Sequence, residues 1–197
     1  MRLVLSTFMS LDGVVQAPGG PDEDTDGGFA HGGWSMPFFD VASMGSAMDA
    51  VLAGADALLL GRRTWQSMAA AWPERAGDPF ADRMNRIPRY VVSHTLQPDD
   101  LTWSNSTLPP ADTIGAVEGL RRQPGRDLVV MGSSRLAQLL IRHDVVDEFR
   151  LMIEPVLLGG GKKLFPDDGK MRTLELVSTT TSSTGVQIAI YRTLRGT

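Results

Sequence analysis

Ala55-Asp56-Ala57-Leu58-Leu59-Leu60-Gly61-Arg62-Arg63-Thr64-Trp65 is the stretch that decides the fold. Its apolar run is short and stops at Gly61, which is typical of a strand covered on both faces of a sheet. A helix is expected to begin at Thr64, so its free N–H groups and the guanidinium groups of Arg62 and Arg63 meet at one point. Forked, charged donors suit a phosphate, and the stretch therefore predicts a nucleotide site.

Two further apolar segments end in small polar residues or glycine. In an open parallel sheet, ligands bind outside the carboxyl ends of the strands, so the three strand ends are expected to line one groove. The alternative is that each glycine only ends its strand and that the arginines are solvated, but repetition of the pattern favours a groove. The residues at the two further strand ends are Ser93 and His94, and Gly132, Ser133, Ser134, Arg135 and Leu136.

Strands and helices alternate along the chain. This alternation predicts an α/β fold, with a mainly parallel sheet of about eight strands, helices on both faces and an antiparallel C-terminal hairpin. Residues 1–197 are expected to form one domain, since no linker or repeat interrupts the pattern. The expected strands are 3–9, 57–60, 89–93, 101–103, 127–131, 146–153, 174–181 and 186–194, and the expected helices are 39–53, 64–71, 111–122 and 134–142.

Composition excludes several classes of function. The chain has 197 residues, of which 42% are hydrophobic, and a net charge of −4, which argues against nucleic acid or an anionic membrane as partner. It has no cysteine, which excludes disulfides and thiolate metal sites, and its three separated histidines argue against a zinc cluster, so no metal site is expected. No apolar run approaches the ~20 residues needed to span a bilayer. We expect a cytoplasmic protein that acts on a small molecule.

The substrate region is expected at the glycine-rich segment 17–35, which has no apolar periodicity and is interpreted as a lid. Trp34 and Phe38 are candidates to stack on a flat substrate, although aromatic residues also serve packing. Asp40 is the candidate catalytic proton donor. Its alternative role is a helix N-cap, which stabilises by about 1 kcal/mol and demands no chemistry.

The order of the motifs also carries a family resemblance. Leu59–Trp65, Val91–Ser93, Val130–Ser134 and Leu164–Asp167 resemble the successive motifs of dihydrofolate reductases. Ser10–Gly13, Val146–Glu148 and Pro155–Gly160 resemble more closely the reductase domain of the bifunctional riboflavin-biosynthesis deaminase/reductase, the RibD C-terminal domain. The resemblance covers essentially the whole chain, while the deaminase half is absent.

This resemblance implies a three-layer dihydrofolate reductase-like fold and NADPH as cofactor. It places Gly61, Arg62, Arg63 and Thr64 at the adenosine-side phosphates, Ser93 and His94 beside the adenosine, and Gly132, Ser133, Ser134, Arg135 and Leu136 at the pyrophosphate. The riboflavin-pathway reductases associate through this domain, so the resemblance implies a homodimer, with Val156–Leu158 as the candidate interface.

The sequence thus predicts an NADPH-dependent oxidoreductase that reduces a small conjugated heterocycle of the pterin, pyrimidine or flavin-precursor kind. Two alternatives stay open. One is a true dihydrofolate reductase, which lacks support because no pterin-binding carboxylate is assigned. The other is a nucleotide-binding module that keeps the fold without catalysis.

Overall fold

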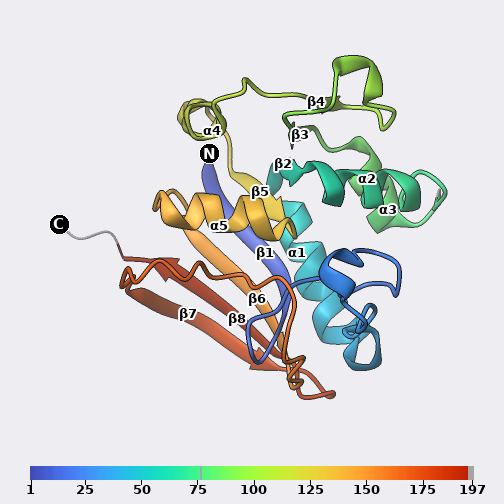
Figure 1. The fold of residues 1–197 in the computed structure, drawn as a ribbon, viewed down its shortest axis with the longest axis vertical. Helices are drawn as coiled ribbons and strands as arrows, with labels where there is room; N and C mark the ends of the chain where they lie inside the picture. The colour runs from blue at the N-terminus through green and yellow to red at the C-terminus, as the bar shows by residue number, and fades with distance from the viewer. Residues whose placement is uncertain (76, 195–197) are drawn as a thin grey trace.

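A single mixed sheet organises the structure, a computed structural model that describes residues 1–75 and 77–194. The strand order is β4-β3-β2-β5-β1-β6-β8-β7, parallel from β4 to β6 and antiparallel in the last two pairs (Figure 1). The α/β prediction with a C-terminal hairpin is confirmed. The strands are β1 Arg2–Ser10, β2 Ala55–Gly61, β3 Arg89–Val92, β4 Ser106–Thr107, β5 Asp127–Met131, β6 Glu148–Glu154, β7 Leu174–Thr181 and β8 Gln187–Thr193.

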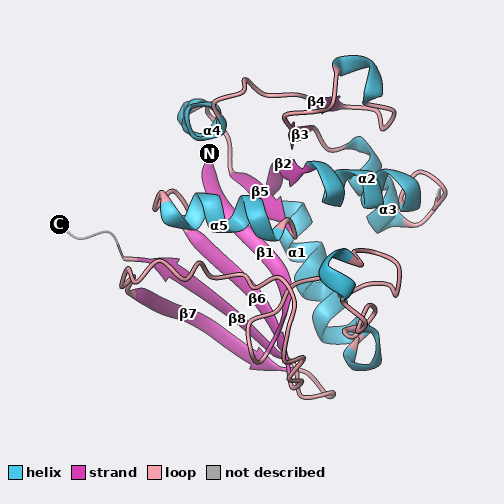
Figure 2. Ribbon diagram, in the orientation of Figure 1, coloured by secondary structure: helices cyan, strands magenta, loops and turns pink. Residues whose placement is uncertain are grey.

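Helices cover both faces of this sheet (Figure 2). Helices α4 and α5 pack on one face, whereas α1, α2 and α3 pack on the other. Within the described part of the chain, no helix is long and apolar enough to cross a membrane. The α-helices are α1 Ser46–Gly54, α2 Arg62–Ala71, α3 Pro79–Arg86, α4 Thr113–Arg122 and α5 Ser134–Arg142, with shorter helical turns at Asp26–Gly28, Met36–Phe38, Val41–Gly45 and Pro98–Asp100.

The central strand β1 shows why its sequence lacks polar alternation. Leu3 and Leu5 belong to the core under α4 and α5, while Val4 between them belongs to the core under α1 and α2. All three are fully buried. Because successive side chains of a strand point to opposite faces, a sheet covered on both faces demands apolar residues at consecutive positions.

The structure corrects several expected elements. The expected strand 101–103 is wrong: Trp103 packs in the core, and the short edge strand β4 begins at Ser106. The expected helix 39–53 is divided into a π-helical turn at 41–45 and α1. Helix α2 begins at Arg62, two residues earlier than expected. Helix α3 was not predicted, although Asp78 caps it and Pro79 occupies its first turn.

Arg89, at the start of β3, fixes this edge of the sheet. Its side chain is only 1% exposed, and its guanidinium lies 3.7 Å from the centre of the Trp103 ring. Burial lowers the pKa of Arg89 to about 10. The guanidinium donates hydrogen bonds to four main-chain carbonyls, those of Met84, Asn85, Ile87 and Ser104.

Replacing Arg89 by leucine is expected to lower the free energy of unfolding by about 3 kcal/mol or more, because several buried carbonyls lose their donors. Urea unfolding followed by tryptophan fluorescence measures the change. Arg83→Leu is the matched control: Arg83 is exposed and lies 4.0 Å from Asp49, so its loss is expected to cost less than about 0.5 kcal/mol. Equal losses in both variants would contradict the structural role of Arg89.

Candidate functional site

The carboxyl ends of β3, β2 and β5 lie next to one another, as the groove hypothesis requires. The closest link joins the ends of β2 and β5. The N–H of Gly61 donates to the Ser133 hydroxyl at 2.9 Å, and this hydroxyl donates to Thr64 Oγ1 at 2.9 Å. The hydroxyl of Ser133 therefore ties the start of α2 to the start of α5, and we call these residues the Ser133 junction.

Backbone conformation makes this close approach possible. Gly132 and Ser133 both adopt left-handed conformations, with φ of 63° and 60°, so the chain turns sharply from β5 into α5. A Cβ added to Gly132 would lie 3.4 Å from Thr64 Cγ2, and one added to Gly61 would lie 3.3 Å from Ser133 Oγ. Leu136, 6% exposed, packs beside the same point.

Helix capping at this junction differs from that of α3 and α4. Neither α2 nor α5 has a side-chain cap or an acidic residue in its first turn. By contrast, Asp78 caps α3, Asp112 caps α4, and Asp40 caps the helical turn that leads into α1. Free N–H groups at a helix start favour an anion. At the two helix starts that meet at the Ser133 junction, N–H groups are therefore open to an anionic ligand.

Three arginines lie near these helix starts, and they differ in their interaction partners. Arg62 hydrogen-bonds only weakly to its own helix, through Gln66 Oε1 at 3.2 Å. Arg135, in the first turn of α5, is exposed and lines a cavity. Arg63 is held by carboxylates of the glycine-rich loop.

This loop carries an acidic clamp formed by Asp24 and Asp26. Asp26 pairs with Arg63 and, at 2.9 Å, with Lys162; Asp24 pairs with Lys162 and, at 3.5 Å, with Arg63. Hydrogen bonds from Lys162 and then Arg63 lower the pKa of Asp26. Gln16 braces the clamp, because its side-chain amide donates to the carbonyls of both aspartates and accepts from the Lys162 N–H.

A cavity of about 660 Å³ lies beside the clamp. Its walls come from the loop, from the first turn of α5 and from the glycine turn after β6. This volume is within the range of small-molecule sites. Its lining includes Gln16, Phe29, His31, Arg135, Gly159–Gly161 and Lys162.

Ser93 and His94 lie at the expected strand end, after β3. The Ser93 hydroxyl accepts hydrogen bonds from the N–H groups of Thr95 and Leu96, so it shapes its own turn. His94 is exposed. Their expected contact with adenosine stays a prediction.

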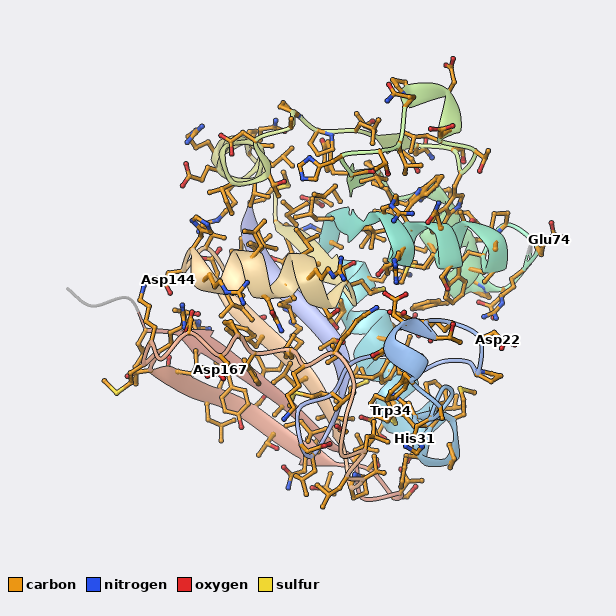
Figure 3. All side chains as sticks on the ribbon, viewed as in Figure 1. Asp22, His31, Trp34, Glu74, Asp144 and Asp167 are labelled. Carbon is orange, nitrogen blue, oxygen red and sulfur yellow. The ribbon has the colours of Figure 1, made fainter. Side chains whose placement is uncertain are left out.

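Trp34 and Phe38 both serve packing in this structure. The Trp34 indole N–H donates to the Gln16 carbonyl at 2.7 Å, and the ring is 7% exposed (Figure 3 labels Trp34 and His31 on this loop). Phe38 packs against the cluster that contains Met44 and Met152. These contacts anchor the far end of the glycine-rich loop to the sheet.

Asp40 caps the helical turn Val41–Gly45, which was the alternative to a catalytic role. Its carboxylate accepts hydrogen bonds from the N–H groups of Ala42 and Ser43, and from both the N–H and the hydroxyl of Ser183. These bonds, those from Ser183 above all, lower the pKa of Asp40 to about 2. A carboxylate that stays ionised at neutral pH is a poor proton donor, so the structure does not support the catalytic assignment.

Glu154 is a buried carboxyl that the sequence analysis did not single out. It ends β6, is 0% exposed, and accepts hydrogen bonds from the Ser35 hydroxyl at 2.7 Å and from the Met9 N–H at 3.2 Å. Burial raises the pKa of Glu154 to about 7. The available signal was a charged residue closing an otherwise apolar strand, directly before Pro155.

Comparison with known proteins gives one family and two uncharacterised relatives. The model of the RibD C-terminal domain matches residues 2–188. The uncharacterised protein YyaP of Bacillus subtilis is 29% identical over 200 residues, which cover 96% of this chain and 94% of YyaP. The uncharacterised protein YwjB of the same organism is 26% identical over 137 residues, or 70% of this chain and 74% of YwjB.

Solved structures share the fold at low sequence identity. A protein assigned to riboflavin biosynthesis from Shewanella sp. PV-4 superposes with a TM-score of 0.76 and 17% identity, over 99% of this chain and 100% of that one. A pyrimidine reductase-like protein from Corynebacterium diphtheriae gives a TM-score of 0.65 and 16% identity, over 99% and 92% of the two chains. These likenesses establish the fold.

The double substitution Asp24→Asn and Asp26→Asn is expected to free the glycine-rich loop, because Arg63 and Lys162 lose their ionic partners. Partly exposed pairs contribute up to about 1 kcal/mol each, so amide hydrogen exchange of residues 17–35 is expected to rise roughly five-fold. Mass spectrometry of the exchange measures this. Asp22→Asn, an exposed position on the same loop, is the control. Unchanged exchange in the double variant would contradict the clamp.

Proposed function

The chain belongs to the RibD C-terminal domain family, and on this premise we propose that it is an NADPH-dependent oxidoreductase of a small conjugated heterocycle. The substrate class is pterin-, pyrimidine- or flavin-precursor-like. The observation that carries the proposal is the pair of uncapped helix starts at the Ser133 junction. The free N–H groups at the start of α5 suit the pyrophosphate of a dinucleotide, and those at the start of α2 suit its adenosine-side phosphate.

The residues present fit such a cofactor. The N–H groups of residues 62–64 and 133–135 would hold phosphate oxygens, with Arg62 supplying charge at the first site and Arg135 at the second. Forked guanidinium donors favour a terminal phosphate ester, and hence NADPH over NADH. Arg63 would join them once Asp24 and Asp26 release it.

NADPH would supply the hydride in this chemistry, and the protein would orient the reacting rings and exclude water from them. The cavity beside Arg135 has room for a flat ring, with Phe29 and Gln16 on its walls. The loop that carries Phe29 also carries the acidic clamp, so its closure would exclude water from the reacting rings.

We also propose a homodimer in the cytoplasm. Leu157, in the segment Val156–Leu158, is 70% exposed, so its side chain is available to a second copy of the chain. Light scattering coupled to size exclusion is expected to give twice the 21.3 kDa chain mass. Leu157→Glu is expected to halve that mass, whereas Leu176→Glu on the edge strand β7 serves as the control. A monomeric unmodified protein would contradict the dimer.

Arg62→Ala is expected to weaken NADPH binding about ten-fold or more and to leave NADH binding nearly unchanged, because it removes a charged donor to the extra phosphate. Fluorescence titration of each reduced nucleotide measures both affinities. Arg122→Ala is the control, since Arg122 is an exposed arginine of α4 paired only loosely with Glu118 at 3.9 Å.

Equal weakening of both nucleotides by Arg62→Ala would contradict the phosphate assignment. Lack of saturable NADPH binding by the unmodified protein would refute the reductase proposal. Tight NADPH binding without consumption in the presence of oxidised pterins, pyrimidines or flavin precursors would favour a non-catalytic nucleotide module instead.

A further inference from the structure

The acidic clamp contacts both parts of the proposed site. Arg63 is the second residue of α2, at one of the two helix starts without a side-chain cap. Asp26 and Lys162 line the cavity of about 660 Å³. The Asp26 carboxylate accepts hydrogen bonds from both cations, and Asp24 pairs with both as well. One pair of carboxylates therefore links the proposed phosphate site of α2 to the wall of the cavity.

The two cations of the clamp differ in their exposure and in their other contacts. The Arg63 side chain is 50% exposed, against 21% for that of Lys162. The main chain of Lys162 is also fixed, because its N–H donates to Gln16 Oε1 at 3.0 Å and its carbonyl accepts from the Val15 N–H at 2.9 Å. Ion pairs of exposed side chains are weak and are screened by salt. The Arg63 half of the clamp is therefore the half that a dissolved anion can displace.

A phosphate ester is a stronger partner for Arg63 than the carboxylates of the loop. It carries a charge of about −1.5 to −2 at pH 7 and three acceptor oxygens, whereas a carboxylate has a single charge on two oxygens. At the start of α2 a phosphate also meets free N–H groups, and among the described residues neither Asp24 nor Asp26 accepts from these. Repulsion between carboxylate and phosphate opposes their sharing one guanidinium.

Loss of Arg63 from the clamp would weaken one wall of the cavity. Residues 26–31 of the glycine-rich loop line this cavity, opposite the glycine turn after β6. The Phe29 ring packs on that turn, since a Cβ added to Gly161 would lie 2.9 Å from Phe29 Cε2. The clamp fastens the other end of the segment through four ion pairs, and two of these are made by Arg63.

We propose that Asp24 and Asp26 compete with the phosphate ester that distinguishes NADPH from NADH, so that binding of NADPH takes Arg63 from the clamp and loosens the loop over the cavity. This inference rests on the proposed reductase function and adds a regulation of its site. NADH lacks the ester and leaves the clamp in place. Lys162 keeps its pairs with both carboxylates, so the loop remains tethered and closes again over the substrate.

The neighbouring arginine and the neighbouring acids do not take part in this competition. Arg62 is bound to a neutral partner, the side-chain amide of Gln66 at 3.2 Å, so it is available to the ester from the start. Glu23 accepts a hydrogen bond from the Gly19 N–H at 2.7 Å, and among the described residues only Asp24 and Asp26 form ion pairs with Arg63. Arg63 therefore adds its charge to the cofactor site only when the clamp opens.

Nucleotide affinity tests the competition. Asp26→Asn removes a carboxylate that binds Arg63 and keeps the size of the side chain. It is expected to tighten NADPH binding about five-fold, because Arg63 is then more readily available to the cofactor, and to change NADH binding by less than about two-fold. Fluorescence titration of each reduced nucleotide measures both affinities. Unchanged or weaker NADPH binding in Asp26→Asn would overturn the proposal.

Asp22→Asn is the matched control, because it removes one negative charge from an exposed position of the same loop (Figure 3). It is expected to change both affinities by less than about two-fold, since salt screens exposed charges that are not in contact. Equal tightening of NADPH binding by Asp22→Asn and Asp26→Asn would show a general effect of charge and would contradict a competition for Arg63.

A double-mutant cycle assigns the effect to Arg63. Asp26→Asn is expected to change NADPH affinity by less than about two-fold when it is made in the Arg63→Ala variant, because the cation for which carboxylate and phosphate compete is gone. A gain of about five-fold that persists in the Arg63→Ala variant would refute the competition.

Amide hydrogen exchange tests the effect on the cavity wall, with two nucleotides that lack the nicotinamide. Adenosine 2′,5′-bisphosphate carries the ester, and adenosine 5′-monophosphate does not. The bisphosphate is expected to raise the exchange of residues 24–31 about five-fold, while the monophosphate leaves it unchanged. In Asp26→Asn this exchange is expected to be raised before any nucleotide is added. Unchanged or slower exchange of these residues with the bisphosphate would overturn the loosening of the loop.

The outcomes separate this inference from the proposed function. Saturable NADPH binding that Asp26→Asn does not tighten would refute the competition and leave the reductase standing. Lack of saturable NADPH binding by the unmodified protein would remove both.

Discussion

The hydrogen bonds of the Ser133 hydroxyl are the constraint on which the rest of the site depends. They hold the start of α2 against the start of α5, at the ends of the neighbouring strands β2 and β5. Because each helix begins without a side-chain cap, the junction concentrates two sets of free N–H groups at one edge of the sheet. The left-handed backbone of Gly132 and Ser133 makes this possible. The left-handed turn at Ser133 and the two hydrogen bonds of its hydroxyl therefore set the relative position of the two helix starts.

The glycine-rich loop links this junction to the proposed chemistry. One end is held by charge, through Asp24 and Asp26, and the other by buried contacts of Trp34 and Ser35. Exposed ion pairs are weak and yield to a competing phosphate, whereas the buried contacts resist water. The loop is therefore held by exposed ion pairs at one end and by buried hydrogen bonds at the other.

Strand alternation and the glycine strand ends were predictable, because a sheet covered on both faces imposes apolar runs such as Leu58–Leu60 and sharp exits such as Gly132. The strand predicted at 101–103 was wrong because the apolar Trp103 is buried against the Arg89 guanidinium and does not lie in a strand. The acidic clamp and the buried position of Glu154 could not be predicted from the sequence for a different reason. Asp24 meets Lys162 across 138 positions, and Ser35 meets Glu154 across 119, and no local pattern records such contacts.

Amide chemical shifts recorded while NADPH is added test the central claim most directly. The account predicts saturable shifts concentrated at the N–H groups of residues 62–64 and 133–135, the two open helix starts. Saturable shifts elsewhere, with these amides unmoved, would contradict it.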